Sequence, residues 1–171
     1  MNVATAMLKR AGVGVVSILF LMMSGSVIAE SSSSEVPADW IKVAAGHEFN
    51  LMAPAGTEFH PSEGIDSFVG DFEAPDFKLS FDFGQYSNSL KDISGDARYE
   101  IRDILIDGKA ANIVTAYAPR FSTDHPYFIG IHFPEVKTTG RGPTKLTVFG
   151  LLETADDYTV IEKIFGTIRF D

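Results

Sequence analysis

Acidic side chains gather in one short part of the chain. Asp66, Asp71, Glu73, Asp76 and Asp82 place five carboxylates within seventeen residues, against a single lysine. Clustered carboxylate oxygens are the ligands that hard cations such as calcium prefer. The loop pattern D-x-D-x-D-G is missing, and exposed charged faces are common in acidic proteins. The sequence therefore predicts no cofactor, and a divalent cation held by Asp66, Asp71 and Asp82 stays open as an alternative.

Two histidines lie close to acids in the sequence. His132 and Glu135 have the spacing H-x-x-E, and His125 follows Asp124. Zinc and copper sites need three or four converging ligands. We expect His132 on a strand and His125 in the loop before it, so two isolated histidines are the simpler interpretation. A metal site that uses His125 and His132 stays open beside it.

No serine stands in a pattern typical of a hydrolase. The nucleophile elbow G-x-S-x-G is missing, and Ser67 lies within a predicted strand. A Ser/His/Asp triad can assemble from residues far apart in the sequence, so a small hydrolase stays open. Glycine patterns that bind phosphate or dinucleotides are also missing. No catalytic residue is predicted.

The triplet Asp82-Phe83-Gly84 is the one with which protein kinases hold magnesium. The glycine-rich loop, the strand lysine and the H-R-D motif of kinases are missing from this chain. Alternation gives a simpler account, because one face of the stretch carries the apolar residues Phe77, Leu79, Phe81 and Phe83. We therefore predict a strand that ends at Gly84, with Asp82 directed away from the core.

Strand signals dominate the chain from Trp40 onward. Besides an extended segment at Phe49 and Leu51, the predicted strands cover residues 65–73, 77–83, 101–106, 109–117, 127–133, 145–152 and 167–170. An even-length loop at 75–76 would place Phe72 opposite Leu79. Asp107-Gly108 is a preferred pair for a two-residue type I′ hairpin, because both positions need positive φ.

One segment near the C-terminus changes to helical spacing. The residues that recur every three or four positions are Tyr158, Ile161, Ile164 and Phe165. We expect Thr154 to cap this helix and Gly166 to end it. Hairpins closed by one amphipathic helix and a strand predict an α+β fold, an antiparallel sheet with a helix packed on a face.

The N-terminus has the composition of a secretory signal. Lys9-Arg10 precedes an apolar run, and small residues end it at Ala29. We predict a signal peptide over residues 1–29, a Ser-rich flexible linker over 30–39 and a single domain over 40–171. The protein would then be periplasmic or secreted.

Charge and cysteine content limit the partners. Removal of residues 1–29 takes away two bases and no acid, so the formal net charge of −9 becomes −11. A strongly acidic protein repels phosphate backbones and anionic lipids, so we expect no nucleic-acid partner and, after signal cleavage, no membrane partner. The chain has no cysteine, which excludes disulfides and thiol catalysis.

Two polar loops are candidates for binding, because loops on a rigid sheet often carry binding groups. Tyr86 and Asn88 belong to the first, and Lys137 and Arg141 to the second. Ordinary connections between strands are the simpler interpretation.

Three short stretches resemble PsbP/DcrB-like domains. Phe49 to Gly56 is similar to their opening F-x-x-x-x-P-x-G, Ile106 to Ala111 to their central turn, and Asp157 to Ile168 to their terminal helix and strand. The resemblance covers about residues 40–171 and implies an α/β/α sandwich around an antiparallel sheet. Many members are exported bacterial proteins of unassigned function, and the resemblance carries no catalytic residue.

The leading hypothesis is an exported, non-catalytic accessory or binding domain. Its partner would be a protein or a small ligand in the cell envelope. One alternative is a small metal-dependent or Ser/His/Asp hydrolase. Another is a structural envelope protein anchored by an uncleaved N-terminus.

Overall fold

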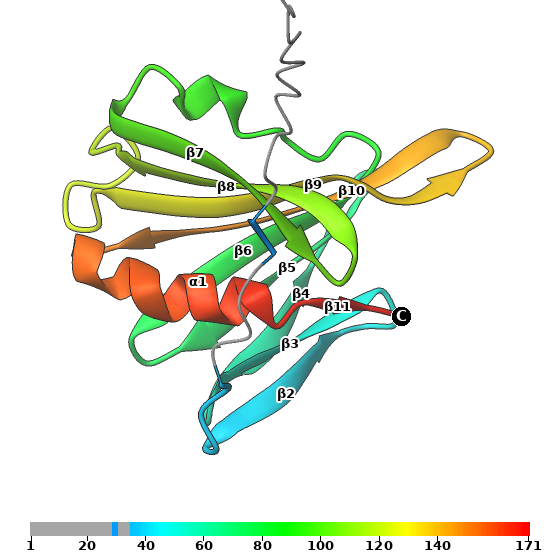
Figure 1. Cartoon of the computed structure of the whole chain (residues 1–171), viewed down its shortest axis with the longest axis horizontal. Coiled ribbons are helices and arrows are strands. Elements are labelled where there is room, and N and C mark those ends of the chain that lie inside the picture. Colours follow the sequence, from blue (N-terminus) through cyan, green and yellow to red (C-terminus); the bar gives the residue numbers. More distant parts are fainter. Residues whose placement is uncertain (1–28, 31–34) are drawn as a thin grey trace, which may run out of the picture.

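The computed structural model describes residues 29–30 and 35–171 (Figure 1). Residues 1–28 of the predicted signal peptide and residues 31–34 of the predicted linker lie outside this part. The short strand β1 (Ala29–Glu30) straddles the predicted cleavage point and pairs in parallel with β7 (Ala97–Ile106). Within the described part of the chain, no helix has the length and apolar character needed to cross a bilayer.

Two β-sheets build the domain. The large sheet has eight strands in the order β1-β7-β8-β9-β10-β6-β5-β4, and the small sheet has three in the order β11-β3-β2. The remaining strands of the large sheet are β4 (Glu58–Ser62), β5 (Phe68–Ala74), β6 (Phe77–Gly84), β8 (Lys109–Tyr117), β9 (Tyr127–Thr139) and β10 (Gly142–Leu152). Those of the small sheet are β2 (Trp40–Ala45), β3 (Phe49–Pro54) and β11 (Arg169–Phe170).

One α-helix, α1 (Tyr158–Gly166), lies across a single face of the large sheet, beside the small sheet (Figure 1). Its buried residues Ile161, Ile164 and Phe165 belong to the same core as Phe49 of β3 and Ile131 of β9. We call the face of the large sheet that packs on this core the inner face, and the opposite one the outer face. The helix is preceded by a 3₁₀ turn, η2 (Ala155–Asp157), so Thr154, the predicted cap of the helix, precedes this turn instead, and Asp157 is the N-cap of α1. Thr154 donates its backbone N–H and its hydroxyl to the Asp157 carboxylate.

The predicted alternation and register are confirmed in the central hairpins. Phe72 lies opposite Leu79, as an even-length turn between β5 and β6 requires. The Asp107-Gly108 turn between β7 and β8 has φ values of 53° and 70°, which is the type I′ geometry. Antiparallel pairing of the large sheet is therefore correctly predicted for these strands.

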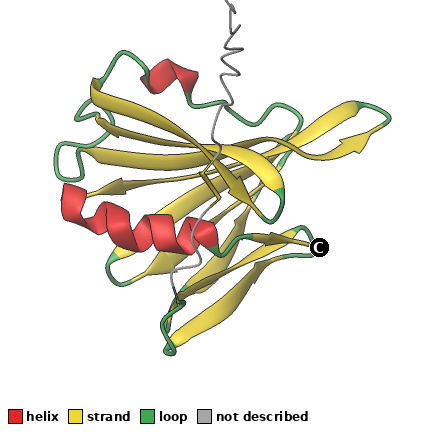
Figure 2. Cartoon of the chain, in the orientation of Figure 1, coloured by secondary structure: helices red, strands yellow, loops and turns green. Residues whose placement is uncertain are grey.

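The predicted α+β fold, a PsbP-like α/β/α sandwich, is wrong. Strands make up most of the domain, and α1 is the single α-helix among the described residues (Figure 2). The outer face is covered by residues 85–96, which contain one 3₁₀ turn, η1 (Lys91–Ile93), and no α-helix. The motifs that suggest the sandwich specify turns and one helix, and they leave the second helical layer undetermined.

Several predicted boundaries are also corrected. β5 begins at Phe68 rather than at Ile65, whose side chain is fully exposed. β4 is not predicted, because Pro61 and polar residues weaken its signal, as is usual for an edge strand. Gly166 is the last residue of α1 rather than a left-handed stop after it, because Thr167 caps the helix by donating its hydroxyl to the Ile164 carbonyl oxygen at 2.6 Å.

Phe81 is a buried aromatic residue in the middle of the inner core. Its ring is 3% exposed, and its centroid lies 5.1 Å from that of Phe49 and 5.2 Å from that of Phe68. We expect Phe81→Ala to lower the free energy of unfolding by about 3–5 kcal/mol in urea titrations, because a large cavity is left. Tyr86→Ala, in the loop after the same strand, is the matched control. Its side chain is 75% exposed, so a change of more than about 0.5 kcal/mol would contradict this assignment.

Candidate functional site

A row of polar side chains crosses the outer face of the large sheet. Cross-strand pairing aligns Asp82 of β6 with Thr147 of β10. It also aligns Thr147 with His132 of β9, and His132 with Asn112 of β8. All four side chains lie on the outer face, because their neighbours along each strand belong to the inner core. Apolar side chains line much of the remaining face, so this polar row is distinct from its surroundings.

The Thr147 hydroxyl is the centre of a buried hydrogen-bond network. Its oxygen lies 2.6 Å from the Asn88 carbonyl oxygen, 2.6 Å from Ser87 Oγ and 2.9 Å from His132 Nδ1. A carbonyl oxygen can only accept, so the single Thr147 proton goes to Asn88. Ser87 Oγ and His132 Nδ1 must therefore both donate to Thr147, which assigns the proton of the neutral His132 ring to Nδ1.

Burial keeps the His132 ring neutral. Loss of solvation, helped by the positive charges of Lys145 and Lys91, lowers the pKa of His132 from 6.5 to about 4. Since Ser87 and His132 both donate to the same oxygen, His132 does not accept the Ser87 proton. The arrangement is a structural network and lacks the contact between nucleophile and base that a serine hydrolase needs.

A small hollow opens beside the polar row, and we call it the outer pocket. It has a volume of about 280 Å³ and lies between the outer face of β6, β9 and β10, the segment 85–96 and the loop at Phe121. Its apolar lining consists of Leu90, Ile93, Phe121, Phe128, Phe149 and Leu151. Its polar lining consists of Asp82, Asn88, Asp92 and Thr147. The rings of Phe128 and Phe149 are stacked with centroids 6.1 Å apart. An apolar surface with few polar groups is typical of a small-molecule site.

Asp82 carries a polar atom without a partner. Its Oδ1 is buried and has no hydrogen bond, and it is the one such side-chain atom in the part of the chain that the structure describes. Burial raises the pKa of the Asp82 carboxyl, the Ser67 hydroxyl opposes this change and the negative charge of Asp66 adds to it. A buried oxygen without a donor costs free energy. The residue also belongs to the lining of the outer pocket.

Two larger hollows lack this feature. One, of about 980 Å³, is an open groove between the start of α1 and the β5–β6 turn, and its lining includes Ser122 and His125. The other, of about 560 Å³, lies between α1 and the strands β7 and β8. Asp82 lines neither of them. The outer pocket is therefore the better candidate site in spite of its smaller volume.

Residues 85–96 form the outer wall of the pocket, and Leu90 holds them on the sheet. A Cβ added at Gly130 of β9 would lie 2.7 Å from Leu90 Cδ1, so the missing side chain is what lets Leu90 approach the strand. Leu90 has φ 60°, a left-handed conformation that costs about 1–2 kcal/mol for a non-glycine residue. The Asn88 side-chain oxygen accepts a hydrogen bond from the Leu90 backbone N–H at 2.8 Å and supports this turn.

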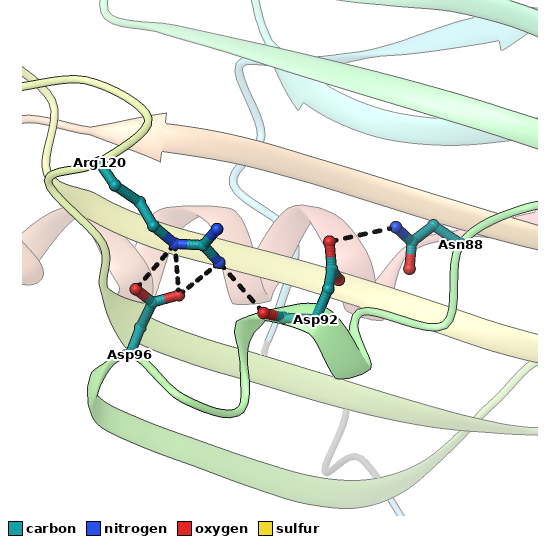
Figure 3. Close-up of polar contacts among 4 residues, drawn as sticks. All are labelled: Asn88, Asp92, Asp96 and Arg120. Atoms are coloured by element: carbon teal, nitrogen blue, oxygen red, sulfur yellow. Dashed lines mark hydrogen bonds and ion pairs between the residues drawn. The ribbon is translucent and has the colours of Figure 1, made fainter.

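Arg120 fastens the same segment to the loop on the other side of the pocket (Figure 3). Its guanidinium donates to the Asp96 carboxylate at 2.8, 3.0 and 3.1 Å, and to the Asp92 carbonyl oxygen at 3.1 Å. The hydrogen bonds from Arg120 lower the pKa of Asp96. The Arg120 guanidinium also lies 4.2 Å from the centroid of the Phe121 ring. The ion pair therefore connects two walls of the outer pocket.

The structure separates the predicted metal ligands. Asp71 accepts a hydrogen bond from Ser80 at 2.6 Å and pairs with Lys78 at 3.1 Å. Asp66 lies in the loop before β5, where its charge acts on Asp82. Across residues 29–30 and 35–171, no group of three or more His, Asp or Glu side chains gathers as metal ligands would. A divalent cation at these carboxylates therefore stays an untested prediction.

The two candidate histidines are also apart. His125 lies in the loop before β9, where its backbone N–H donates to Ser122 Oγ at 3.1 Å. His132 is five residues beyond Tyr127 along β9, which is about 16 Å at the rise of a strand. Among the described residues, neither histidine belongs to a group of three or more side chains that could hold a metal ion.

Of the four candidates in the predicted binding loops, Asn88 alone lines the outer pocket. Tyr86 points into solvent. Lys137 Nζ pairs with Glu48 Oε2 at 2.5 Å and so joins β9 to the β2–β3 turn. Arg141 is exposed at the tip of the β9–β10 hairpin, where its backbone N–H donates to Thr139 Oγ1 at 3.4 Å.

Most of the residues that line the outer pocket were not predicted as site residues. Phe149 and Leu151 alternate with the inner-face residues Leu146 and Val148, and this was a usable signal. A strand that is apolar on both faces must be covered on both faces. The sequence does not say which segment covers it, because the contacts of residues 85–96 with β9, β10 and Arg120 are remote along the chain.

No family model matches the chain, and no curated protein matches it. Membership of the PsbP/DcrB-like family therefore stays a prediction.

We expect the His132 network to make stability depend on pH. The folded-state pKa of about 4 lies below the ordinary value of 6.5, so protonation favours the unfolded chain. The contribution is present above pH 6.5 and is lost as the pH falls to about 4, by an amount on the order of 3 kcal/mol. In urea titrations over this range, His132→Asn should lose less stability than the wild type, because its amide still donates to Thr147 but does not titrate. His125→Asn, at an exposed loop position, should follow the wild type. Parallel curves for the wild type and His132→Asn would contradict the assignment.

We expect the Arg120 ion pair to hold the pocket wall in place. Arg120→Gln should speed amide hydrogen exchange in residues 85–96 while strands β9 and β10 stay protected, because local opening of the segment becomes easier. Arg141→Gln removes an equal charge from an exposed hairpin tip and is the control. Unchanged exchange in residues 85–96 of Arg120→Gln would show that other contacts hold the segment.

Proposed function

We propose that this chain is an exported, non-catalytic binding domain that holds a small apolar ligand in the outer pocket. The N-terminal sequence supports export, as a signal peptide over residues 1–29 would direct the domain to the periplasm or the medium. The shape and lining of the outer pocket support binding of a small molecule rather than of a flat protein surface. The ligand would lie on the rings of Phe128 and Phe149, under residues 85–96.

The observation that carries this proposal is the combination of an apolar lining with the unpaired Oδ1 of Asp82. Buried polar atoms in folded proteins nearly always have a partner. Asp82 also lines the outer pocket, so its carboxyl is the polar contact that we assign to a bound molecule. The rest of the lining offers apolar contacts to the ligand. Removing this apolar surface from water on binding is favourable.

The proton positions around Thr147 support a binding role over a hydrolytic one. Ser87 and His132 both donate to the Thr147 hydroxyl, so the one buried histidine is occupied in holding the pocket wall. His125 and Ser122 meet through a backbone N–H rather than through the imidazole ring. Neither pair offers a base placed to activate a serine hydroxyl.

The experiment that tests the pocket uses 2-phenylethanol, a neutral probe with an aromatic ring. We expect it to shift the NMR signals of residues around Phe128 and Phe149 in the purified protein. Leu151→Trp should fill the pocket and weaken binding about tenfold or more, which corresponds to about 1.4 kcal/mol.

Ile65→Trp makes the same kind of change at a fully exposed loop position and is the matched control. This variant should bind 2-phenylethanol as the wild type does. Equal binding by Leu151→Trp and the wild type, or signal shifts located away from the outer pocket, would rule out this site.

A further inference from the structure

We infer that the outer pocket selects a ligand that carries a positively charged nitrogen, and that Asp82 binds this nitrogen. The inference rests on the proposed function, since it names the chemical class of ligand for the same pocket. The ligand would be a small amphiphilic amine, with an aromatic or short alkyl body on the apolar lining and an ammonium group at Asp82.

Among the described residues, no base acts on the Asp82 carboxyl. None of the residues that line the outer pocket is basic. Ser67 and Asp66 are the neighbours that act on the Asp82 carboxyl, and Asp66 adds negative charge. Arg120, which precedes the pocket residue Phe121, already donates to both carboxylate oxygens of Asp96. In the part of the chain that the structure describes, the charge of Asp82 therefore has a hydroxyl neighbour but no basic partner.

A second carboxylate strengthens the negative character of the pocket. Asp92 lines it from the opposite wall, in η1, and its side chain accepts a weak hydrogen bond from the Asn88 amide at 3.5 Å. The protein as a whole is also acidic, with a formal net charge of −9. Lys91 and Lys145 place positive charge near His132, but the charged residues that line the pocket itself are the two carboxylates, which favour a cation and repel an anion.

The apolar lining sets the size and nature of the rest of the ligand. A volume of about 280 Å³ corresponds to roughly nine water molecules at about 30 Å³ each, so about nine or ten non-hydrogen atoms fit. Phe121 lies near Phe128 with ring centroids 6.3 Å apart, and Phe128 stacks on Phe149. These ring faces suit an aromatic or aliphatic body, and they also attract a nearby ammonium group.

Three probes of similar size separate charge from shape. The probes are 2-phenylethylamine, 2-phenylethanol and phenylacetate, titrated into the purified protein near neutral pH and followed by NMR. We expect the amine to bind about tenfold or more tightly than the alcohol, because a hydrogen bond to a charged group is stronger than a neutral one. Phenylacetate should bind least tightly of the three.

The Asp82→Asn variant tests the residue assignment. It keeps the side-chain size, and it should weaken binding of 2-phenylethylamine far more than binding of 2-phenylethanol, so that the two affinities become about equal. Asp92→Asn removes the same charge from an exposed side chain and should have a smaller effect. If Asp82→Asn does not fold, the wild-type ratio of amine to alcohol affinity still decides, and it should fall as acid protonates Asp82.

The outcomes separate this inference from the proposed function. If the amine and the alcohol bind at the outer pocket with equal affinity, the charge selection is overturned and the binding function stands. The same holds if Asp82→Asn leaves their ratio unchanged. If none of the three probes shifts signals at the outer pocket, the proposed function and this inference are both overturned.

Discussion

The central strands of the large sheet bury side chains on both faces, and the rest of the architecture follows from this constraint. On the inner face, β9 and β10 meet α1 and the small sheet in one continuous core. On the outer face, Phe128, Phe149 and Leu151 would be exposed to water without a second cover. Residues 85–96 provide that cover, although they contain only one 3₁₀ turn. A short irregular cover does not pack against the whole face, and the space left between it, the sheet and Phe121 is the outer pocket.

The cover is held by polar contacts at both ends and by an apolar contact in the middle. Thr147 bonds to Ser87 and to the Asn88 backbone near the start of the segment. Arg120 bonds to Asp96 at its end (Figure 3). Leu90 packs between them on the sheet. Three separate attachments fix an irregular segment much as a regular helix would be fixed by its own hydrogen bonds.

Sequence reasoning predicts the parts of this fold that depend on local rules. The register of β5 and β6, the turn at Asp107-Gly108 and the helix after Thr154 each follow from alternation, turn preference or helical spacing. The cover over the outer face does not follow from such rules. Arg120 and Asp96 are 24 residues apart, and the positive φ of Leu90 has no signal in a leucine. Asp82 was correctly placed on the outer face, but its lack of a partner depends on neighbours that only the folded chain brings together.

Gly130 has a consequence for how relatives of this protein can be recognised. A side chain at this position would displace Leu90, so the two positions are constrained together although they lie on different segments. A related sequence that keeps the pocket should have a glycine at the position of Gly130, the fourth residue of β9. It should have a large aliphatic residue at the position of Leu90, in the segment 85–96. A sequence with a side chain at the position of Gly130 should have a smaller residue at the position of Leu90. This pair of positions marks the pocket more specifically than the short turn and helix motifs do, because it records a contact between the sheet and its cover.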